Sequence, residues 1–193
     1  MSLAYSMPPF IHEAEYLAGE PLATERHEYV QGRIYAMAGS SKRHNRIAGN
    51  IYRALMSEPS ECVAYISDMK VRAEKSHSYY YPDVVVGCNE EANEYFLEQP
   101  CLIVEVTSDS TLRKDYLEKA LAYQSIAALQ MYLIVAQDKV LVDVLRRGTE
   151  GDWELSQVDD LRAEIELPCP VMRLSVGQIY AGVVDITLTP LSR

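Results

Sequence analysis

The chain lacks the long hydrophobic segments that cross membranes. No apolar run approaches the roughly 18 residues that a membrane-spanning helix needs. The N-terminus has no basic stretch followed by an apolar one, so we expect no secretory signal. Internal repeats, low-complexity tracts and Pro-, Gly- or Ser-rich linkers are also absent. These absences predict one domain, residues 1–193, which is long enough for a core that folds alone.

Cysteine is scarce. The chain has four, at Cys62, Cys88, Cys101 and Cys169, and none forms the Cys-x-x-Cys spacing of common zinc sites. Three of them stand in apolar stretches. We therefore expect small buried thiols in a reduced cytosol rather than disulfides or zinc ligands, which indicates a cytoplasmic protein.

Positive charge is in short supply as well. The sequence has 18 Lys and Arg against 28 Asp and Glu, a net charge of −10. This balance argues against tight non-specific binding of nucleic acid. It does not exclude a nuclease, because metal ions neutralise charge within such a site. Basic residues gather at 42–46, 113–114 and 146–147, and each cluster by itself is typical of solvated surface.

Hydrophobic periodicity predicts a mixed chain of the α/β or α+β class with one central mixed sheet flanked by helices. Gly32 suits the turn of a hairpin over 28–37, Ser41 begins a helix that Pro59 stops, and the turn at 74–77 joins two antiparallel strands. The other expected helices lie at 11–18, 22–27, 112–125 and 175–182, and the strands at 62–72, 79–87, 101–107, 131–136, 139–147, 153–158 and 164–167.

Two of these strands carry one carboxylate each in an otherwise apolar run. Asp83 stands near the start of Tyr-Pro-Asp-Val-Val-Val, and Glu105 near the end of Leu-Ile-Val-Glu-Val-Thr. A buried charge is costly unless it is paired or holds a metal ion. If the strands are antiparallel, the two carboxylates converge at one edge of the sheet and can bind a divalent cation.

The helix after Glu105 carries a lysine on its packed face. Leu112, Tyr116, Lys119 and Tyr123 follow one another at helical spacing. Two interpretations remain open for Lys119. It forms a salt bridge with the residue one turn earlier, Asp115, or it points toward the two carboxylates of the strands.

Three further residues are candidates for supporting roles. Glu28, on the first hairpin arm, is either an additional ligand or a solvent-facing side chain. His44, at the start of a helix, contacts a phosphate or relays a proton, or else has a capping or surface role. Asp68 approaches Asp83 if the strands 62–72 and 79–87 pair, or it is simply a charge at a strand end.

The order of these residues resembles a known family. Pro82-Asp83 followed by Glu105-x-Thr107 resembles the PD-(D/E)xK signature of restriction-endonuclease-like nucleases. The closer resemblance is to the Uma-two family of endonuclease-like proteins. Its marks are His27-Glu-Tyr-Val-x-Gly32, Ala38-Gly-Ser-x-x-x-His44-Asn45, Tyr-Pro-Asp83-Val-Val, Ile-Val-Glu105-Val-x-Ser108-x-Ser-Thr111, Asp115, Lys119, Tyr123 and Tyr132. The resemblance implies a single PD-(D/E)xK nuclease-like domain with a restriction-endonuclease-like central mixed β-sheet.

The chain departs from the usual motif at its lysine, because Thr107 stands two residues after Glu105. Threonine supplies no cation and donates at most a hydrogen bond. The resemblance implies that Lys119 replaces this lysine from the following helix. Lys70 is a second candidate, since its strand is expected beside that of Asp83. If neither reaches the site, the domain binds metal without cutting.

The implied activity is a Mg²⁺- or Mn²⁺-dependent endonuclease that hydrolyses phosphodiester bonds in DNA. Asp83, Glu105 and the backbone carbonyl of Val106 would bind the metal, and Lys119 would orient or deprotonate the attacking water. A homodimer would supply two sites for a double-strand cut. Two alternatives remain. One is an inactive relative that binds nucleic acid or a protein; the other is a hydrolase of small phosphate esters, which the absence of a Gly-rich phosphate loop disfavours.

Overall fold

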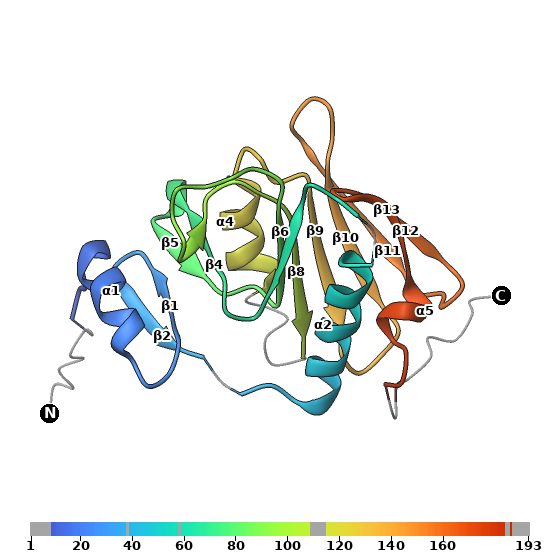
Figure 1. Cartoon of the computed structure of the whole chain (residues 1–193), viewed down its shortest axis with the longest axis horizontal. Coiled ribbons are helices and arrows are strands. Elements are labelled where there is room, and N and C mark those ends of the chain that lie inside the picture. Colours follow the sequence, from blue (N-terminus) through green and yellow to red (C-terminus); the bar gives the residue numbers. More distant parts are fainter. Residues whose placement is uncertain (1–8, 38, 58, 109–114, 184–185, 187–193) are drawn as a thin grey trace, which may run out of the picture.

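The computed structural model has a mixed α/β architecture with two main β-sheets and a separate hairpin (Figure 1). It describes residues 9–37, 39–57, 59–108, 115–183 and 186. The fold class predicted from the sequence is therefore confirmed, although the single central sheet is replaced by two. In the described part of the chain, no helix has the length and apolar character needed to cross a membrane.

The larger sheet has the strand order β11-β10-β9-β8-β6-β3. Its strands are β3 (Val63–Ile66), β6 (Val84–Gly87), β8 (Pro100–Thr107), β9 (Met131–Ala136), β10 (Val142–Arg147) and β11 (Trp153–Val158). The smaller sheet has the order β2-β1-β5-β4-β7. Its strands are β1 (His27–Val30), β2 (Arg33–Ala36), β4 (Lys70–Ala73), β5 (Ser78–Tyr80) and β7 (Phe96–Leu97). The separate hairpin pairs β12 (Glu164–Pro168) with β13 (Val171–Ser175).

The helices of the described part pack against the two sheets. They are α1 (Glu13–Gly19), α2 (Lys42–Leu55), α4 (Ala120–Gln124) and α5 (Val176–Ile179), with a π-helical turn η3 (Asp115–Lys119) before α4 and 3₁₀ turns at Glu20–Leu22 and Glu74–Ser76. Ile47 and Ile51 of α2 join the same buried cluster as Val84 and Val104. Tyr123 of α4 lies in the cluster of the opposite face. The larger sheet thus separates two hydrophobic cores, one under α2 and one under α4.

The division into two sheets corrects the predicted strands at 62–72 and 79–87. Each is interrupted, so that β3 and β6 pair in the larger sheet while β4 and β5 pair in the smaller one. Ser67 has a left-handed backbone (φ 60°), and Pro82 has no N–H to donate to a ladder. These residues allow the chain to leave one sheet and enter the other.

Some of the other expected elements agree with the structure and others do not. The hairpin at 28–37 is confirmed, and its turn residues Gln31 and Gly32 both have positive φ (50° and 86°), as a two-residue turn between twisted strands requires. The helix at 22–27 is wrong, since β1 begins within it. Strands β7 and β13 are present in addition to the strands that the sequence predicts. Of the helix at 112–125, the described residues form η3 and α4, and residues 112–114 lie outside the described part.

The register of the central strands decides where the carboxylates lie. β6 and β8 are antiparallel, with Val84 opposite Val104, so Asp83 is placed opposite Glu105 one step further along. The antiparallel pairing on which the expected convergence of the two carboxylates depends is therefore present. β9 lies parallel to β8 on its other side, with Ile134 beside Glu105. Glu105 is therefore held between two strands near the end of β8.

The cysteines are not the free thiols expected from the sequence. Cys62 is bonded to Cys88, and Cys101 to Cys169. The physical reason lies in the register, because the pairing of Val63 with Gly87 places Cys62 opposite Cys88. Sequence spacing contains no information about such partners across a sheet.

Asp143 of β10 provides a test of how burial affects stability. Its side chain is buried, and Gln157 Nε2 donates a hydrogen bond to its Oδ1 at 2.7 Å. Burial raises the pKa of the Asp143 carboxyl, an effect that the hydrogen bond only partly offsets. The folded state then binds more protons than the unfolded state between the ordinary and the raised pKa, so stability falls as pH rises through this window.

We therefore expect Asp143→Asn to gain stability relative to the wild type as pH rises from about 4 to 7. Urea unfolding at both pH values measures the difference. Asp160→Asn is the matched control, because its hydrogen bonds from Arg162 lower the pKa of Asp160 and reverse the sign. A difference between the Asp143→Asn variant and the wild type that does not change with pH would contradict the argument.

Candidate functional site

Asp83 connects the start of α2 to the end of β8. It stands just before β6 and is half-buried. Its Oδ1 lies 2.7 Å from His44 Nε2, and its Oδ2 accepts a hydrogen bond of 2.7 Å from the backbone N–H of Val106. The Ser41 hydroxyl accepts the backbone N–H of His44 and so caps α2 at this point. The carboxylate of Asp83 is therefore held directly beside the strand residue that follows Glu105.

Glu105 belongs to a buried cluster around one lysine. Lys119 Nζ lies 2.8 Å from Glu105 Oε1 and 3.0 Å from Glu28 Oε1. The Tyr123 hydroxyl donates a hydrogen bond of 2.9 Å to Glu105 Oε1. The side chains of Lys119, Glu28 and Glu105 are only 8%, 6% and 6% exposed. The last residue of η3, the hairpin strand β1 and the central strand β8 thus meet at one point.

Tyr123 acts as a fixed hydrogen-bond donor in this cluster. Its side chain is fully buried, and burial, followed by the charge of Glu105, raises its pKa well above the ordinary value. The hydroxyl therefore keeps its proton and orients Glu105. The sequence placed Tyr123 on the packed helix face but gave it no role at the site. Its position four residues after Lys119 is the signal that identifies it.

Acidic side chains outnumber basic ones among the described residues of this cluster. Glu28, Glu105 and Asp83 contribute three carboxylates, whereas Lys119 contributes one ammonium. Buried carboxylates of this kind are stable where they are paired, hydrogen-bonded or bound to a cation.

The structure distinguishes between the alternatives left open for three residues. Lys119 contacts the carboxylates, while the side chain of Asp115 lies outside the described residues. Glu28 is buried against Lys119, so the solvent-facing interpretation is wrong. His44 contacts Asp83 rather than projecting only into solvent.

Two sequence candidates do not join the cluster. Asp68 pairs with Arg26 at 2.6 Å, and its side chain is 69% exposed. Lys70 is buried in the smaller sheet with its Nζ 5.5 Å from the ring centroid of Tyr81, and burial lowers its pKa. Neither side chain makes an ion pair with Asp83 or Glu105 among the described residues. Of the two candidate lysines, only Lys119 reaches Glu105.

Comparison with known proteins adds to this geometry. Residues 14–177 match the sequence model of the Uma2 family, described as "Putative restriction endonuclease". The chain belongs to the Uma2 family. Two relatives from Synechocystis sp. (strain ATCC 27184 / PCC 6803 / Kazusa) also match. Uncharacterized protein slr1290 is 33% identical over 180 residues, covering 90% of this chain and 93% of that protein. Uncharacterized protein sll1609 is 36% identical over 159 residues, covering 79% of this chain and 90% of that protein.

A solved structure shares the fold of this Uma2 chain. It is the crystal structure of "a putative nuclease belonging to DUF820" from Anabaena variabilis ATCC 29413. The two structures superpose with a TM-score of 0.66 at 19% identity, over 90% of this chain and 98% of the other. At this level of identity the match establishes the fold alone.

The donor set of this Uma2 site fits a hard divalent cation. Carboxylate oxygens are the ligands that Mg²⁺ prefers, and Mg²⁺ is commonly held by one or two carboxylates, waters and substrate phosphates. Among the described side chains, no three Asp, Glu or His residues have ligand atoms all within 4.8 Å of one another. Waters and substrate oxygens would have to supply the remaining ligands of such an ion. Thr107 is buried in β8, and the N–H of Val106 is already directed to Asp83.

Proposed function

We propose that this Uma2 protein is a Mg²⁺-dependent endonuclease, with Mn²⁺ able to substitute, that hydrolyses phosphodiester bonds in DNA. The observation that carries the proposal is the contact between Lys119 Nζ and Glu105 Oε1 at 2.8 Å. This contact places the ammonium group of Lys119 beside Glu105. The usual motif has a lysine two residues after the glutamate, where this chain has Thr107. Family membership and the position of Asp83 opposite Glu105 support the same activity.

Asp83 and Glu105 would hold the metal, with the backbone carbonyl of Val106 as a third ligand. A bound Mg²⁺ lowers the pKa of its water and stabilises negative charge on phosphate oxygens. Lys119 would donate a hydrogen bond to the attacking water and stabilise the charge that develops on the phosphate. Glu28 holds Lys119 from the other side, and His44 fixes Asp83.

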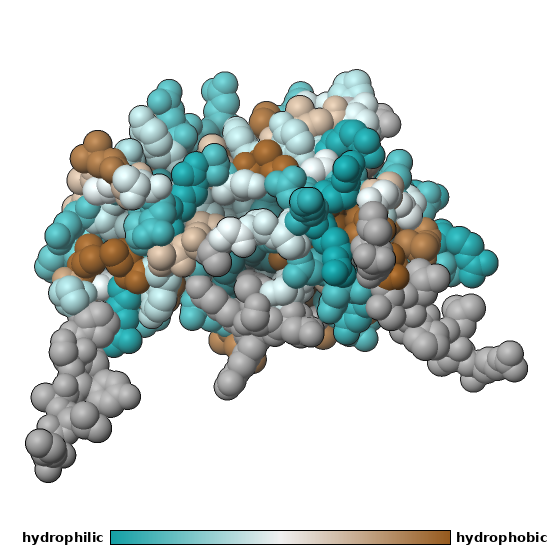
Figure 2. Space-filling model, turned by 90° about the horizontal axis from the view of Figure 1, so that it is seen from below, coloured by the Kyte–Doolittle hydropathy of each residue, from teal (hydrophilic) through white to brown (hydrophobic). Residues whose placement is uncertain are grey.

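Cationic side chains at the start of α2 suit a DNA backbone. Lys42, Arg43 and Arg46 are exposed in the first turns of this helix, whose N-terminus lies near the end of β8 (Figure 1). In Figure 2, which shows the molecule from below, hydrophilic residues cover much of this face and hydrophobic residues form separate patches. A helix N-terminus and basic side chains both attract phosphate. These exposed cations provide local positive charge on a chain whose net charge is −10.

Cleavage of supercoiled plasmid tests the proposal. With Mg²⁺ or Mn²⁺ we expect nicked or linear products, and EDTA should abolish them.

The second candidate is an inactive Uma2 domain that binds nucleic acid or a protein, which Thr107 at the lysine position favours. A complex with labelled DNA in a mobility-shift assay, without cleavage of plasmids or genomic DNA, would support that candidate and overturn the nuclease proposal.

His44 provides a more selective test of the site. His44→Ala should lower the cleavage rate by about 10–100-fold, as expected when a residue that orients a metal-binding carboxylate is lost. Glutamine retains a donor that can reach Asp83, so His44→Gln should recover much of the rate. Single-turnover kinetics with saturating enzyme separates this effect from weaker DNA binding. Equal activity of the alanine variant and the wild type would exclude a positioning role for His44.

A further inference from the structure

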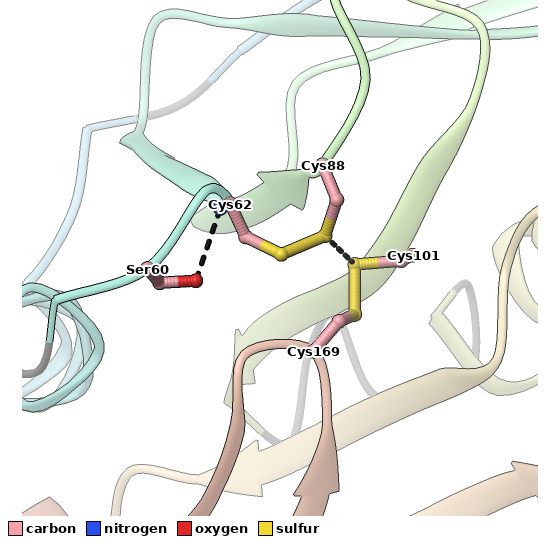
Figure 3. The surroundings of a disulfide bond; sticks show 5 residues. All are labelled: Ser60, Cys62, Cys88, Cys101 and Cys169. Carbon is pink, nitrogen blue, oxygen red and sulfur yellow. Dashed lines mark hydrogen bonds between the residues drawn. A yellow bond between two sulfur atoms is a disulfide. The ribbon is translucent and has the colours of Figure 1, made fainter.

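Four cysteine sulfur atoms from separate segments meet at one place (Figure 3). Cys62 directly precedes β3, Cys88 follows β6, Cys101 lies at the start of β8, and Cys169 stands in the loop between β12 and β13. The two disulfides touch, with 3.3 Å between the sulfur atoms of Cys88 and Cys101. The sulfur atoms of Cys88, Cys101 and Cys169 all lie within 4.8 Å of one another.

We propose that the reduced protein binds one Zn²⁺ ion through these four cysteines. In a tetrahedral site each thiolate sulfur lies about 2.3 Å from zinc, which places the sulfur atoms about 3.8 Å from one another. The fold already holds three of these sulfur atoms, those of Cys88, Cys101 and Cys169, within 4.8 Å of one another, and the fourth, of Cys62, is bonded to Cys88. Reduction breaks the two S–S bonds and allows the bonded pairs to separate toward the same spacing.

The burial of the cluster suits a structural zinc site. Cys101 and Cys169 are buried (6% and 5% exposed), which excludes competing water from one side. Cys62 and Cys88 are half-buried, which leaves a path from the surface. Binding requires no electron transfer, because four thiols lose four protons as the ion enters. Disulfides are rare in reducing compartments, where the same four residues are available as thiols.

This site is separate from the carboxylate site in position and in chemistry. Cys101 and Glu105 lie four residues apart on β8, a distance of about 13 Å along a strand. Thiolates are soft ligands that select zinc, whereas the carboxylates suit Mg²⁺. The zinc would connect the β12–β13 hairpin to the strands of the larger sheet.

Metal binding to the full-length, TCEP-reduced protein tests the proposal. Titration with Zn²⁺ against a chromophoric chelator should show one tightly bound equivalent. Co²⁺ should give the thiolate charge-transfer bands and the visible spectrum of a tetrahedral site. Both signals should be lost in Cys62→Ser and Cys101→Ser, and Asp83→Asn should retain them.

Substitution of a buried cysteine such as Cys101 can disrupt folding. Cys62 is half-buried, so Cys62→Ser is the safer substitution, and circular dichroism checks both variants. Wild-type protein with its reduced thiols blocked by iodoacetamide provides an independent measurement and should bind no Zn²⁺. Absence of Zn²⁺ uptake by the reduced, folded wild type would overturn the proposal. Uptake that survives in the blocked protein would overturn it as well, because the ligands would then lie elsewhere.

Discussion

Lys119→Met is expected to lower the free energy of unfolding by about 3–5 kcal/mol at neutral pH. Lys119 lies 2.8 Å from Glu105 and 3.0 Å from Glu28, and all three side chains are less than a tenth exposed. Methionine fills a similar volume but leaves two buried carboxylates without their cation. The penalty of an uncompensated buried charge, rather than the loss of one contact, gives the effect its size. Urea or thermal unfolding followed by circular dichroism measures it.

Two further variants separate charge compensation from general damage. The double variant Glu28→Gln, Lys119→Met also removes the negative charge of Glu28 and should be more stable than Lys119→Met alone. Lys70→Met is the matched control, since Lys70 is also a buried lysine, but burial lowers its pKa and its described contact is the ring of Tyr81. Its stability should change by no more than about 1 kcal/mol. Equal losses in Lys70→Met and Lys119→Met would refute the paired cluster.

Asp83→Asn is expected to lower the rate of metal-dependent DNA cleavage by at least about a hundredfold. A metal ion supplies several kcal/mol of transition-state stabilisation, and each 1.4 kcal/mol corresponds to about a factor of ten. Asparagine has nearly the same shape and can still accept the N–H of Val106, so the fold should be preserved. The rate at which supercoiled plasmid becomes nicked, measured over a range of Mg²⁺ concentrations, reports the change.

Asp68→Asn is the control for this variant. Asp68 lies in the break between β3 and β4 and is largely exposed, but its carboxylate pairs with Arg26 outside the cluster. The Asp68→Asn variant should therefore cleave at the wild-type rate. If both variants retained full activity while EDTA still stopped cleavage, the metal would have to bind away from Asp83. If neither variant nor the wild type cleaved, the binding function would be favoured.

Local sequence patterns by themselves determined much of this protein. The apolar runs around Asp83 and Glu105 predicted two strands, and the two carboxylates were expected to converge if these strands were antiparallel, as they are. Helical spacing predicted that Lys119 and Tyr123 share a packed face, and Ser41 marked the start of α2. These features depend on residues close together in the chain, so periodicity and capping rules are sufficient to identify them.

Only the tertiary structure decided which distant segments meet. Ser67 and Pro82 divide the predicted strands between two sheets, and this division brings Glu28 of the N-terminal hairpin onto Lys119. The same packing gathers four cysteines that share no motif spacing. The pattern of a strand states which of its faces is buried but not which strand lies beside it. The partner depends on how all the elements pack together, because the favourable free energy of burial belongs to the assembled core rather than to any one segment.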